Sequence, residues 1–316
     1  MGIIIKKGIS IILLITTILS LFSCSLFSNS LEDFFSEWEP EVDRSIAIIG
    51  IEYKEEIFYN GEHIKFGHIL EEYYGREPVL LKDSYLAVYN GNLYVAYKYG
   101  SNDNNYGYTI DICSINLTDL KLEVLYTGMF SPKNIPDNVF PKSTSPEIYY
   151  SNLNAYIFDG VSMTIFNLET EEIQKLEICN FEIPSTEKYR VEYLKDDKGW
   201  RDPSGIKIIG DSFERLITFD YMAQRNPYVN KLKELKTEPT YFERIFKVTM
   251  PLDEFFGEAQ CFDDMVYIRC CVFDEDGEEN ALIFSYNCST DSFAFIYHTF
   301  SSSNPDSFVI PVEPRK

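Results

Sequence analysis

The sequence predicts an all-β protein built from repeated antiparallel units. Asn-Gly pairs stand between runs of strand-forming residues at 60–61 and again at 90–91. Asn-Gly is the strongest short signal for a β-hairpin, because both residues accept the positive φ of a type I′ turn. The runs at 93–97 and 281–284 stay apolar without alternation, which indicates strands covered on both faces.

A β-propeller, or a propeller-like array of four-stranded antiparallel units, fits this pattern best, because blades stacked around an axis bury both faces of each sheet. Four apolar strand residues align across the units at spacings of roughly 50 to 60 residues: Val95, Ile157, Ile217 and Ile268. This exceeds the 40 to 50 residues of usual blades, so long loops or a further unit are expected. The alternative is a β-sandwich, which would bury one face of each sheet and show cleaner alternation.

The β domain is expected to cover residues 46–316 and to begin with a small N-terminal unit. Its strands are predicted at 46–51, 53–59 and 62–66. Folding at Asn60 and Gly61 sets Glu56 opposite Lys65 and Ile57 opposite Ile64, both favourable cross-strand pairs. A short helix follows at 68–74, and Gly75 is expected to end it.

The middle of the chain contains two clear meanders. In the stretch 79–127, strands flank Asn90 and Gly91, and two more are predicted at 108–115 and 121–126. The pattern recurs at 147–178, with turns around 159–160 and 168–171.

The second half contains one irregular unit and one regular unit. In the irregular one, strands are predicted at 206–209, 216–221 and 241–248, with a helix at 228–235. The regular unit, 258–300, holds four strands that turn near 263–264, 276–277 and 288–291. A last strand at 307–312 is expected to close the sheet of the N-terminal unit.

The N-terminus has the order of an export signal. Lys6 and Lys7 precede an apolar stretch at 9–19, which runs into Leu21-Phe22-Ser23-Cys24. This segment resembles a bacterial lipoprotein signal with its lipobox. The resemblance implies a signal peptide at 1–23 and acylation of Cys24. It also implies a location in the cell envelope, on the outer face of the bacterial membrane, held through the lipid anchor. An uncleaved membrane helix and an ordinary signal peptide are the alternatives.

Residues 24–45 are expected to form a lipidated tether that contains a short helix. Ser30 fits an N-cap and Pro40 ends the segment, and between them Leu31, Phe34, Phe35 and Trp38 share one helix face. Such a stripe favours docking on the β domain over binding of a partner.

The charge balance limits the partners of the protein. With 28 Lys and Arg against 50 Asp and Glu, the formal net charge is −22. A surface this acidic repels phosphate backbones and anionic lipid head groups. Nucleic-acid binding is therefore not expected. Contact with the membrane is expected through the lipid alone.

Six cysteines remain beyond Cys24, and their number permits disulfides outside the cytoplasm. If the chain turns at 275–278, Cys270 and Cys271 face Ile283 and Leu282, and adjacent strand residues point to opposite faces. Buried thiols are therefore favoured over bridges for Cys113, Cys179, Cys261, Cys270, Cys271 and Cys288.

No segment carries a catalytic or cofactor-binding motif, and no catalytic residue or cofactor is predicted. The histidines His63, His68 and His298 lack the spacing of a metal site. The loop 195–205 offers an aromatic plate on which a sugar could stack, with carboxylates that could accept its hydroxyls: Trp200, Asp196, Asp197 and Asp202. It is the one candidate ligand loop, and a solvated loop is the alternative interpretation.

These features favour a non-enzymatic binding module whose loops contact a protein, peptide or glycan. A carbohydrate-active hydrolase on the same scaffold is the alternative, since two carboxylates about 5 to 9 Å apart can cleave a glycosidic bond. An envelope scaffolding lipoprotein is a third possibility.

Replacing Cys24 with Ala tests the anchor. The variant should leave the membrane fraction and change its electrophoretic mobility, because the acylated sulfur is lost. Fractionation and gel mobility measure both effects, and a variant that stays membrane-bound with unchanged mobility contradicts acylation.

Overall fold

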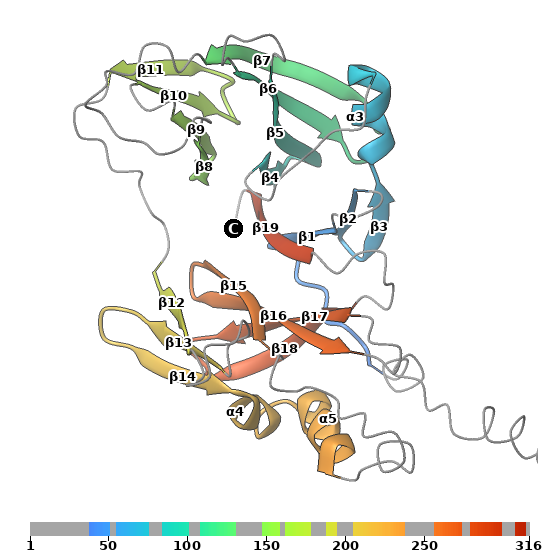
Figure 1. The fold of residues 1–316 in the computed structure, drawn as a ribbon, viewed down its shortest axis with the longest axis vertical. Helices are drawn as coiled ribbons and strands as arrows, with labels where there is room; N and C mark the ends of the chain where they lie inside the picture. Colours follow the sequence, from blue (N-terminus) through green and yellow to red (C-terminus); the bar gives the residue numbers. More distant parts are fainter. Residues whose placement is uncertain are drawn as a thin grey trace, which may run out of the picture.

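The protein is predominantly β, with short helices at its periphery (Figure 1). The computed structural model describes residues 38–50, 55–75, 84–100, 108–130, 147–158, 162–177, 188–194, 205–237, 256–273, 279–298 and 307–313. The helices within these ranges are α3 (Gly67–Tyr74), α4 (Phe219–Ala223) and α5 (Pro227–Thr237). No helix in the described ranges is both long enough and apolar enough to cross a membrane.

The largest sheet joins the beginning and the end of the chain. Its strand order is β3-β2-β1-β19-β4-β5-β6-β7. The strands are β1 (Ile46–Gly50), β2 (Glu56–Tyr59), β3 (Glu62–Lys65), β4 (Tyr85–Tyr89), β5 (Asn92–Gly100), β6 (Tyr108–Asn116), β7 (Leu122–Phe130) and β19 (Ser307–Glu313). Every pair is antiparallel except β19 with β4, which run parallel and pair only at Val312 with Val88 and Glu313 with Tyr89. The sheet therefore consists of two four-stranded antiparallel units joined at β19.

The other sheets are antiparallel and follow chain order. One contains β8 (Glu147–Ser151), β9 (Asn154–Phe158), β10 (Ser162–Asn167) and β11 (Ile173–Glu177). A three-stranded sheet contains β12 (Arg190–Tyr193), β13 (Gly205–Ile209) and β14 (Glu214–Thr218). The last contains β15 (Phe256–Phe262), β16 (Met265–Phe273), β17 (Glu279–Asn287) and β18 (Ser292–His298). The expected four-stranded antiparallel units are thus confirmed for two of these sheets, while the described part of the β12–β14 sheet has three strands.

Buried residues fill the spaces between successive sheets. On β5, Val95 belongs to the cluster shared with β1, β19 and α3, while its neighbour Ala96 belongs to the cluster shared with β8–β10. On β17, Leu282 packs toward β12–β14, α4 and α5, while Ile283 packs toward β1 and β19. Because strand residues alternate between faces, these sheets are covered on both sides. A two-sheet sandwich would cover only one face of each sheet.

One edge strand of each unit lies toward the neighbouring units. Contacts link β8 to β4, β4 to β19, β19 to β15, and β15 to β12. Figure 1 shows β19 and β1 between the upper units (β4–β11) and the lower units (β12–β18). None of the buried clusters of the described residues joins β8–β11 to β12–β14, so the described chain forms an open series of units.

A turn motif recurs between the third and fourth strands of three units. Asn116, Asn167 and Asn287 each accept backbone N–H donors of the second and third residues ahead through Oδ1, at 2.8 to 3.1 Å. The next residue in each case is buried, and its N–H reaches the neighbouring hairpin turn at 2.7 to 3.0 Å. The residue four positions after the Asn takes φ of 55 to 58°. The motif thus ties two turns of a unit together at one end.

The local predictions hold well in the N-terminal half. Asn60 and Asn90 have φ of 52° and 49°, and the register at the first hairpin pairs Glu56 with Lys65 and Ile57 with Ile64. The predicted helix is present as α3, ended by Gly75 at φ 67°. The closing strand is confirmed as β19, which pairs with β1.

Some predictions in the second half were wrong. The strand expected at 216–221 stops at Thr218, whose Oγ1 accepts the N–H of Tyr221 at 3.2 Å and caps α4. Strand β12 was missed because it is short and polar. Ile217 lies in the third strand of its sheet, whereas Val95, Ile157 and Ile268 lie in second strands. The insertion of α4 and α5 lengthens this stretch and shifted the alignment.

The thiol prediction is confirmed for the cysteines that the structure describes, although the register behind it was off by one. Cys270 pairs with Leu282 and Cys271 with Ala281, because an odd number of residues separates Phe273 from Glu279. The free, buried thiols are Cys113, Cys261, Cys270, Cys271 and Cys288. Cys179, like the strand expected at 241–248, lies outside the described residues.

Replacing Asn116 with Ala should lower the free energy of unfolding by about 1 kcal/mol, because two backbone N–H groups lose their acceptor. Urea denaturation measures the change. Thr118→Ala is the matched control on the same exposed turn and should stay within about 0.5 kcal/mol of the wild type. Equal losses in both variants would show that the Asn contact adds nothing.

Candidate functional site

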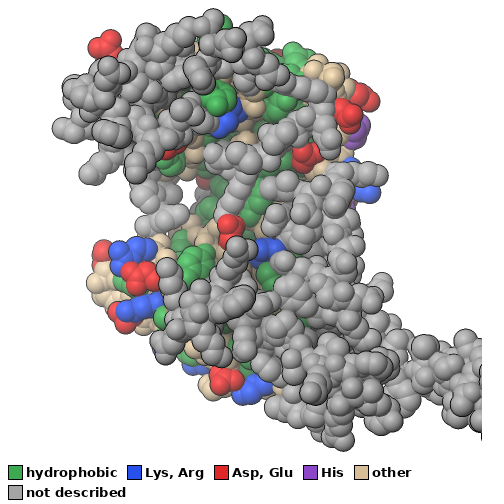
Figure 2. All heavy atoms as spheres, in the orientation of Figure 1, with side chains coloured by type: hydrophobic (Ala, Val, Ile, Leu, Met, Phe, Trp, Pro, Cys, Tyr) green, Lys and Arg blue, Asp and Glu red, His purple; other side chains and the backbone are tan. Residues whose placement is uncertain are grey.

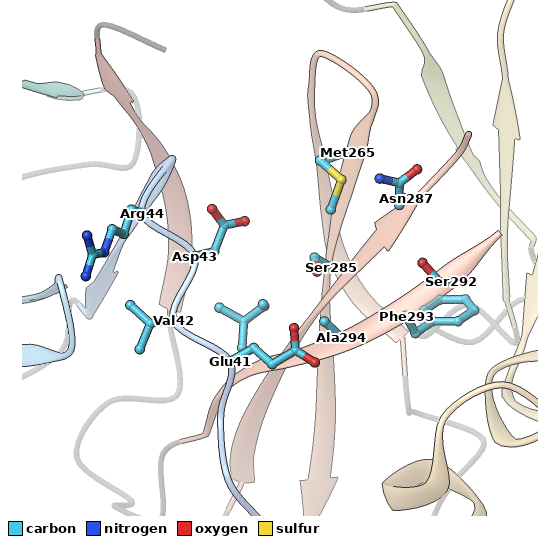
Figure 3. Close-up of a pocket in the computed structure, with 11 residues that line it drawn as sticks. Glu41, Val42, Asp43, Arg44, Met265, Ser285, Asn287, Ser292, Phe293 and Ala294 are labelled. Atoms are coloured by element: carbon cyan, nitrogen blue, oxygen red, sulfur yellow. The ribbon is translucent and has the colours of Figure 1, made fainter. Parts of the chain in front are cut away.

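A hollow among the described residues lies on one face of the β15–β18 sheet, beside the segment 41–44 that leads into β1 (Figure 3). Its volume is about 600 Å³, which is within the range of small-ligand sites. The lining residues are Glu41, Val42, Asp43, Arg44, Met265, Ser285, Asn287, Ser292, Phe293, Ala294 and Ile296.

Small side chains create the floor of this pocket. Ser285 of β17 pairs with Ala294 of β18 and with Tyr267 of β16 in the sheet register. On this face the Tyr267 side chain is large, whereas the small side chains of Ser285 and Ala294 leave space beside it. Ser285 is only 2% exposed, and its hydroxyl has no hydrogen-bond partner among the described residues. A hydroxyl can both donate and accept a hydrogen bond, so the floor offers a polar group to a ligand or to water.

The segment 41–44, which forms the wall of the pocket, is held in place at both ends. The Glu41 N–H donates to the Phe295 carbonyl at 2.7 Å, which adds the segment to the edge of β18. Asp43 accepts the Tyr267 hydroxyl at 2.7 Å and the Ser45 N–H at 2.9 Å. The bonds to Phe295 and Tyr267 run from the wall to the sheet that carries the floor, so the two sides of the pocket are fixed relative to each other.

The end of the pocket is formed where the repeated turn motif changes. In the other two units the turn Asn donates through Nδ2 to an Asn on the paired strand, Asn116 to Asn92 at 3.2 Å and Asn167 to Asn154 at 3.0 Å. In the β15–β18 sheet the equivalent partner of Asn287 is Met265. Asn287 Nδ2 therefore has no hydrogen-bond partner among the described residues, and both side chains line the pocket.

The acidic and basic side chains of the wall point in different directions. Figure 3 shows the Glu41 and Asp43 carboxylates directed toward the sheet and the Arg44 guanidinium directed away from it. Both carboxylates come from the one segment, and the β15–β18 sheet contributes no charged residue to the lining. The pocket is therefore mildly acidic on one side and neutral on the other.

Elsewhere, acidic side chains hold units together. Asp291 accepts the Tyr286 hydroxyl at 2.8 Å and Arg225 Nε at 3.3 Å, and Arg225 lies 3.7 Å over the ring of Tyr221. Asp264 bonds to Lys188, just before β12. These groups join the ends of β15–β18 to the β12–β14 unit and are satisfied by protein partners.

A further carboxylate is buried under α3. Asp111 is 4% exposed and accepts hydroxyls of Tyr74 at 2.8 Å, Tyr99 at 3.3 Å and Thr127 at 2.7 Å. Burial, together with the neighbouring Cys113 and Asp111, raises the pKa of Tyr74 well above its usual range. Because its donors are all side chains of the protein, Asp111 serves the packing of α3 on the sheet.

On the β12–β14 sheet, charged side chains of opposite sign are paired locally. In Figure 2, Lys and Arg side chains lie beside Asp and Glu side chains at the protruding lower left of the molecule, where Figure 1 places β12–β14. The ion pairs there join Arg190 to Glu192 at 2.7 Å and Lys207 to Glu214 at 2.9 Å. Exposed pairs of this kind contribute little to stability.

The residues singled out from the sequence fall elsewhere. Cys24 and the loop residues Trp200, Asp196, Asp197 and Asp202 lie outside the described residues, as does the expected tether helix apart from Trp38. Trp38 is 3% exposed and packs at 4.7 Å from Tyr228 and 4.9 Å from Phe295, ring to ring. Over the described ranges, no three His, Cys, Asp or Glu side chains gather as a metal site would require.

Sequence reasoning missed the pocket because its parts are remote along the chain. The segment 41–44 meets residues 265–296 only through the fold. The one available signal was the repeat itself: aligning Asn116, Asn167 and Asn287 would have shown Met265 in place of Asn92 and Asn154.

Comparisons with known proteins give distant likenesses only. No family model matches the chain, and no curated protein matches it. Among solved structures, it is similar to a putative 6-phosphogluconolactonase from Bacteroides uniformis ATCC 8492, with 10% identity, a TM-score of 0.27 and coverage of 82% of this chain and 84% of that one. A second such protein, from Bacteroides fragilis NCTC 9343, gives 11% identity, a TM-score of 0.25 and coverages of 83% and 84%.

Apo AztD from Citrobacter koseri gives 9% identity and a TM-score of 0.22, over 83% of this chain and 60% of that one. Likenesses this weak say nothing about the activity of this protein.

His298, one of the histidines that the sequence does not assign to a metal site, is partly buried and stacks on Phe295 at 5.7 Å. Burial, and to a smaller extent the charge of His63, lowers the pKa of His298 from 6.5 to about 4. The unfolded chain therefore takes up this proton at a higher pH than the folded chain does. The stability that the neutral imidazole contributes is lost as the pH falls from about 6.5 to about 4.

Replacing His298 with Phe should remove this part of the pH dependence, while the wild-type protein loses stability across the interval. Urea denaturation at pH 7.5, 5.5 and 4.5 measures the difference between the two proteins. His68→Gln, at an exposed position of α3, should follow the wild type. Parallel curves for the wild type and His298→Phe would contradict the assignment.

Proposed function

We propose that the protein is a lipid-anchored, extracytoplasmic binding module of propeller-like architecture, and that the pocket beside segment 41–44 takes part of a protein, peptide or glycan ligand. The observation that carries this proposal is a pocket of about 600 Å³ whose floor presents the Ser285 hydroxyl, which bonds to no described residue. The free amide of Asn287 lies in the same pocket. Ligand sites characteristically combine an apolar surface with a few convergent polar groups.

The unit arrangement supports a propeller-like architecture of five units. With β19 added to β1–β3, the N-terminal unit gains a fourth strand, and its inner edge strand comes from the C-terminus. Edge strands of successive units are in contact along the series β8, β4, β19, β15 and β12. Such a series, with the β4–β7 and β15–β18 sheets covered on both faces, is what a propeller-like architecture leads one to expect.

Binding is better supported than hydrolysis. A glycosidase places two carboxylates on opposite sides of the bond that it cleaves. The two carboxylates of this pocket, Glu41 and Asp43, stand on the same segment. Asp43 is already occupied as an acceptor by Tyr267 and Ser45. The pocket thus offers recognition groups without an opposed acid pair.

The proposed anchor determines where the pocket would lie relative to the membrane. The acylated Cys24 would hold the protein at the outer face of the membrane, and the tether 24–45 would end in the pocket wall. A ligand would then be bound near the attachment point. The net charge of −22 would keep the body away from anionic head groups.

Replacing Ser285 with Phe places a large side chain in the pocket and so tests whether the pocket binds a ligand. Arrays of synthetic peptides and oligosaccharides should show ligands that bind the wild type and are lost, by tenfold or more, in the variant. Ser289→Phe, on an exposed turn of the same sheet, is the matched control and should keep them. An array on which no ligand distinguishes the two variants would overturn the proposed function.

A further inference from the structure

We propose that the pocket is specific for a basic peptide segment: Glu41 pairs with a Lys or Arg side chain, and the Asn287 amide donates to a backbone carbonyl of the peptide. This inference rests on the proposed function and names the ligand class of the same site. It follows from the groups that the fold leaves without partners.

The Asn287 amide is the first such group. Its Oδ1 is occupied by the N–H groups of Ser289 and Thr290, both at 2.9 Å, so the side chain is fixed in the turn. Only Nδ2 is available, and it can only donate. A complementary ligand must therefore present an acceptor here, and a peptide carbonyl is such an acceptor. Met265, in the place of the Asn partner, adds an apolar surface beside it.

Glu41 is the second group. Its main-chain N–H is bound to Phe295, which fixes the residue, while its exposed carboxylate has no partner among the described residues. Asp43 already accepts from Tyr267 and Ser45, and Arg44, the one basic residue among the described lining residues, is directed away. The carboxylate available to a ligand is thus unopposed by a local positive charge, and it attracts a cation. The overall negative charge acts in the same direction.

The lining disfavours a sugar as the occupant. Sugars bind by stacking on a flat aromatic ring. Phe293 is the only aromatic residue among the described residues of this lining. Its ring packs at 4.7 Å from Tyr286 and 6.2 Å from Tyr221, which belong to or pack against the core of the opposite face. Ser285, Ser292 and Ala294 instead leave a smooth floor, along which an extended chain can lie.

The test uses the full-length protein in detergent micelles and pooled ten-residue peptides that are random except for a central Lys, Gln or Glu. The Lys pool should bind most strongly and the Glu pool most weakly, and binding of the Lys pool should fall as salt is added. Glu41→Gln should weaken binding of the Lys pool by about tenfold and should reduce the difference between the Lys and Gln pools.

Met265→Asn tests the second contact without disturbing the fold, because two other units contain this Asn pair. The new side chain should accept from Asn287 Nδ2, so all three pools should bind more weakly, by about fivefold to tenfold. Asn92→Met makes the reverse exchange in the β4–β7 unit and should leave binding unchanged. Wild-type affinity in Met265→Asn would overturn the role of Asn287.

The possible outcomes distinguish a failure of the basic-peptide inference from a failure of the proposed binding function. Binding that Ser285→Phe abolishes but that favours the Glu pool, or neutral oligosaccharides of hexose or N-acetylhexosamine, overturns the basic-peptide inference and leaves the module intact. Binding of the Lys pool that is the same in Ser285→Phe and the wild type places the peptide elsewhere and overturns the inference. If no probe shows pocket-dependent binding, both proposals fail.

Discussion

The pairing of β19 with β1 is the constraint on which the rest of the structure depends. Five consecutive residue pairs join the last strand to the first, from Ile46 with Pro311 to Gly50 with Ser307. The faces of β19 contribute to different cores: Phe308 and Ile310 pack toward β4–β6, and Val309 packs toward β16–β18. A strand that carries two interfaces at once couples the stability of the upper and lower units. It also makes the N-terminal unit incomplete until the end of the chain has been synthesised.

The repeated turn motif shows how this scaffold can acquire a site without losing its frame. In each of the three units, Asn Oδ1 organises the turn and the next buried residue fastens it to the adjacent hairpin. Only the partner of Nδ2 differs, and that difference coincides with the pocket. Since Oδ1 alone maintains the turn, exchanging the partner for Met265 frees a donor at small cost to the fold. The unit therefore keeps its structural role while one of its side chains becomes available to a ligand.

Features that depend on neighbouring residues, such as hairpin turns, could be predicted from the sequence, whereas features that depend on distant parts of the chain could not. Hairpins at Asn60 and Asn90 were predictable because a two-residue turn fixes the register of both strands. The register at Cys270 was wrong by one residue because a longer loop does not determine its own centre. Strand β12, polar and short, had no periodic signal, and Ile217 was misaligned by the helical insertion that follows it. The turn repeat could have pointed to Met265 and Asn287, but not to the rest of the pocket, since segment 41–44 and Ser285 share no pattern in the sequence and meet only through the fold.

The position of the pocket wall gives the site its rigidity. Four contacts fix the segment 38–45: the ring of Trp38 between Tyr228 and Phe295, the Glu41 N–H on β18, Asp43 on Tyr267, and the Ser45 carbonyl, which accepts the Val312 N–H at 2.9 Å. The wall is thus attached both to the sheet that forms the floor and to β19. Because little of it needs to be ordered on binding, most of the interaction energy remains available for affinity.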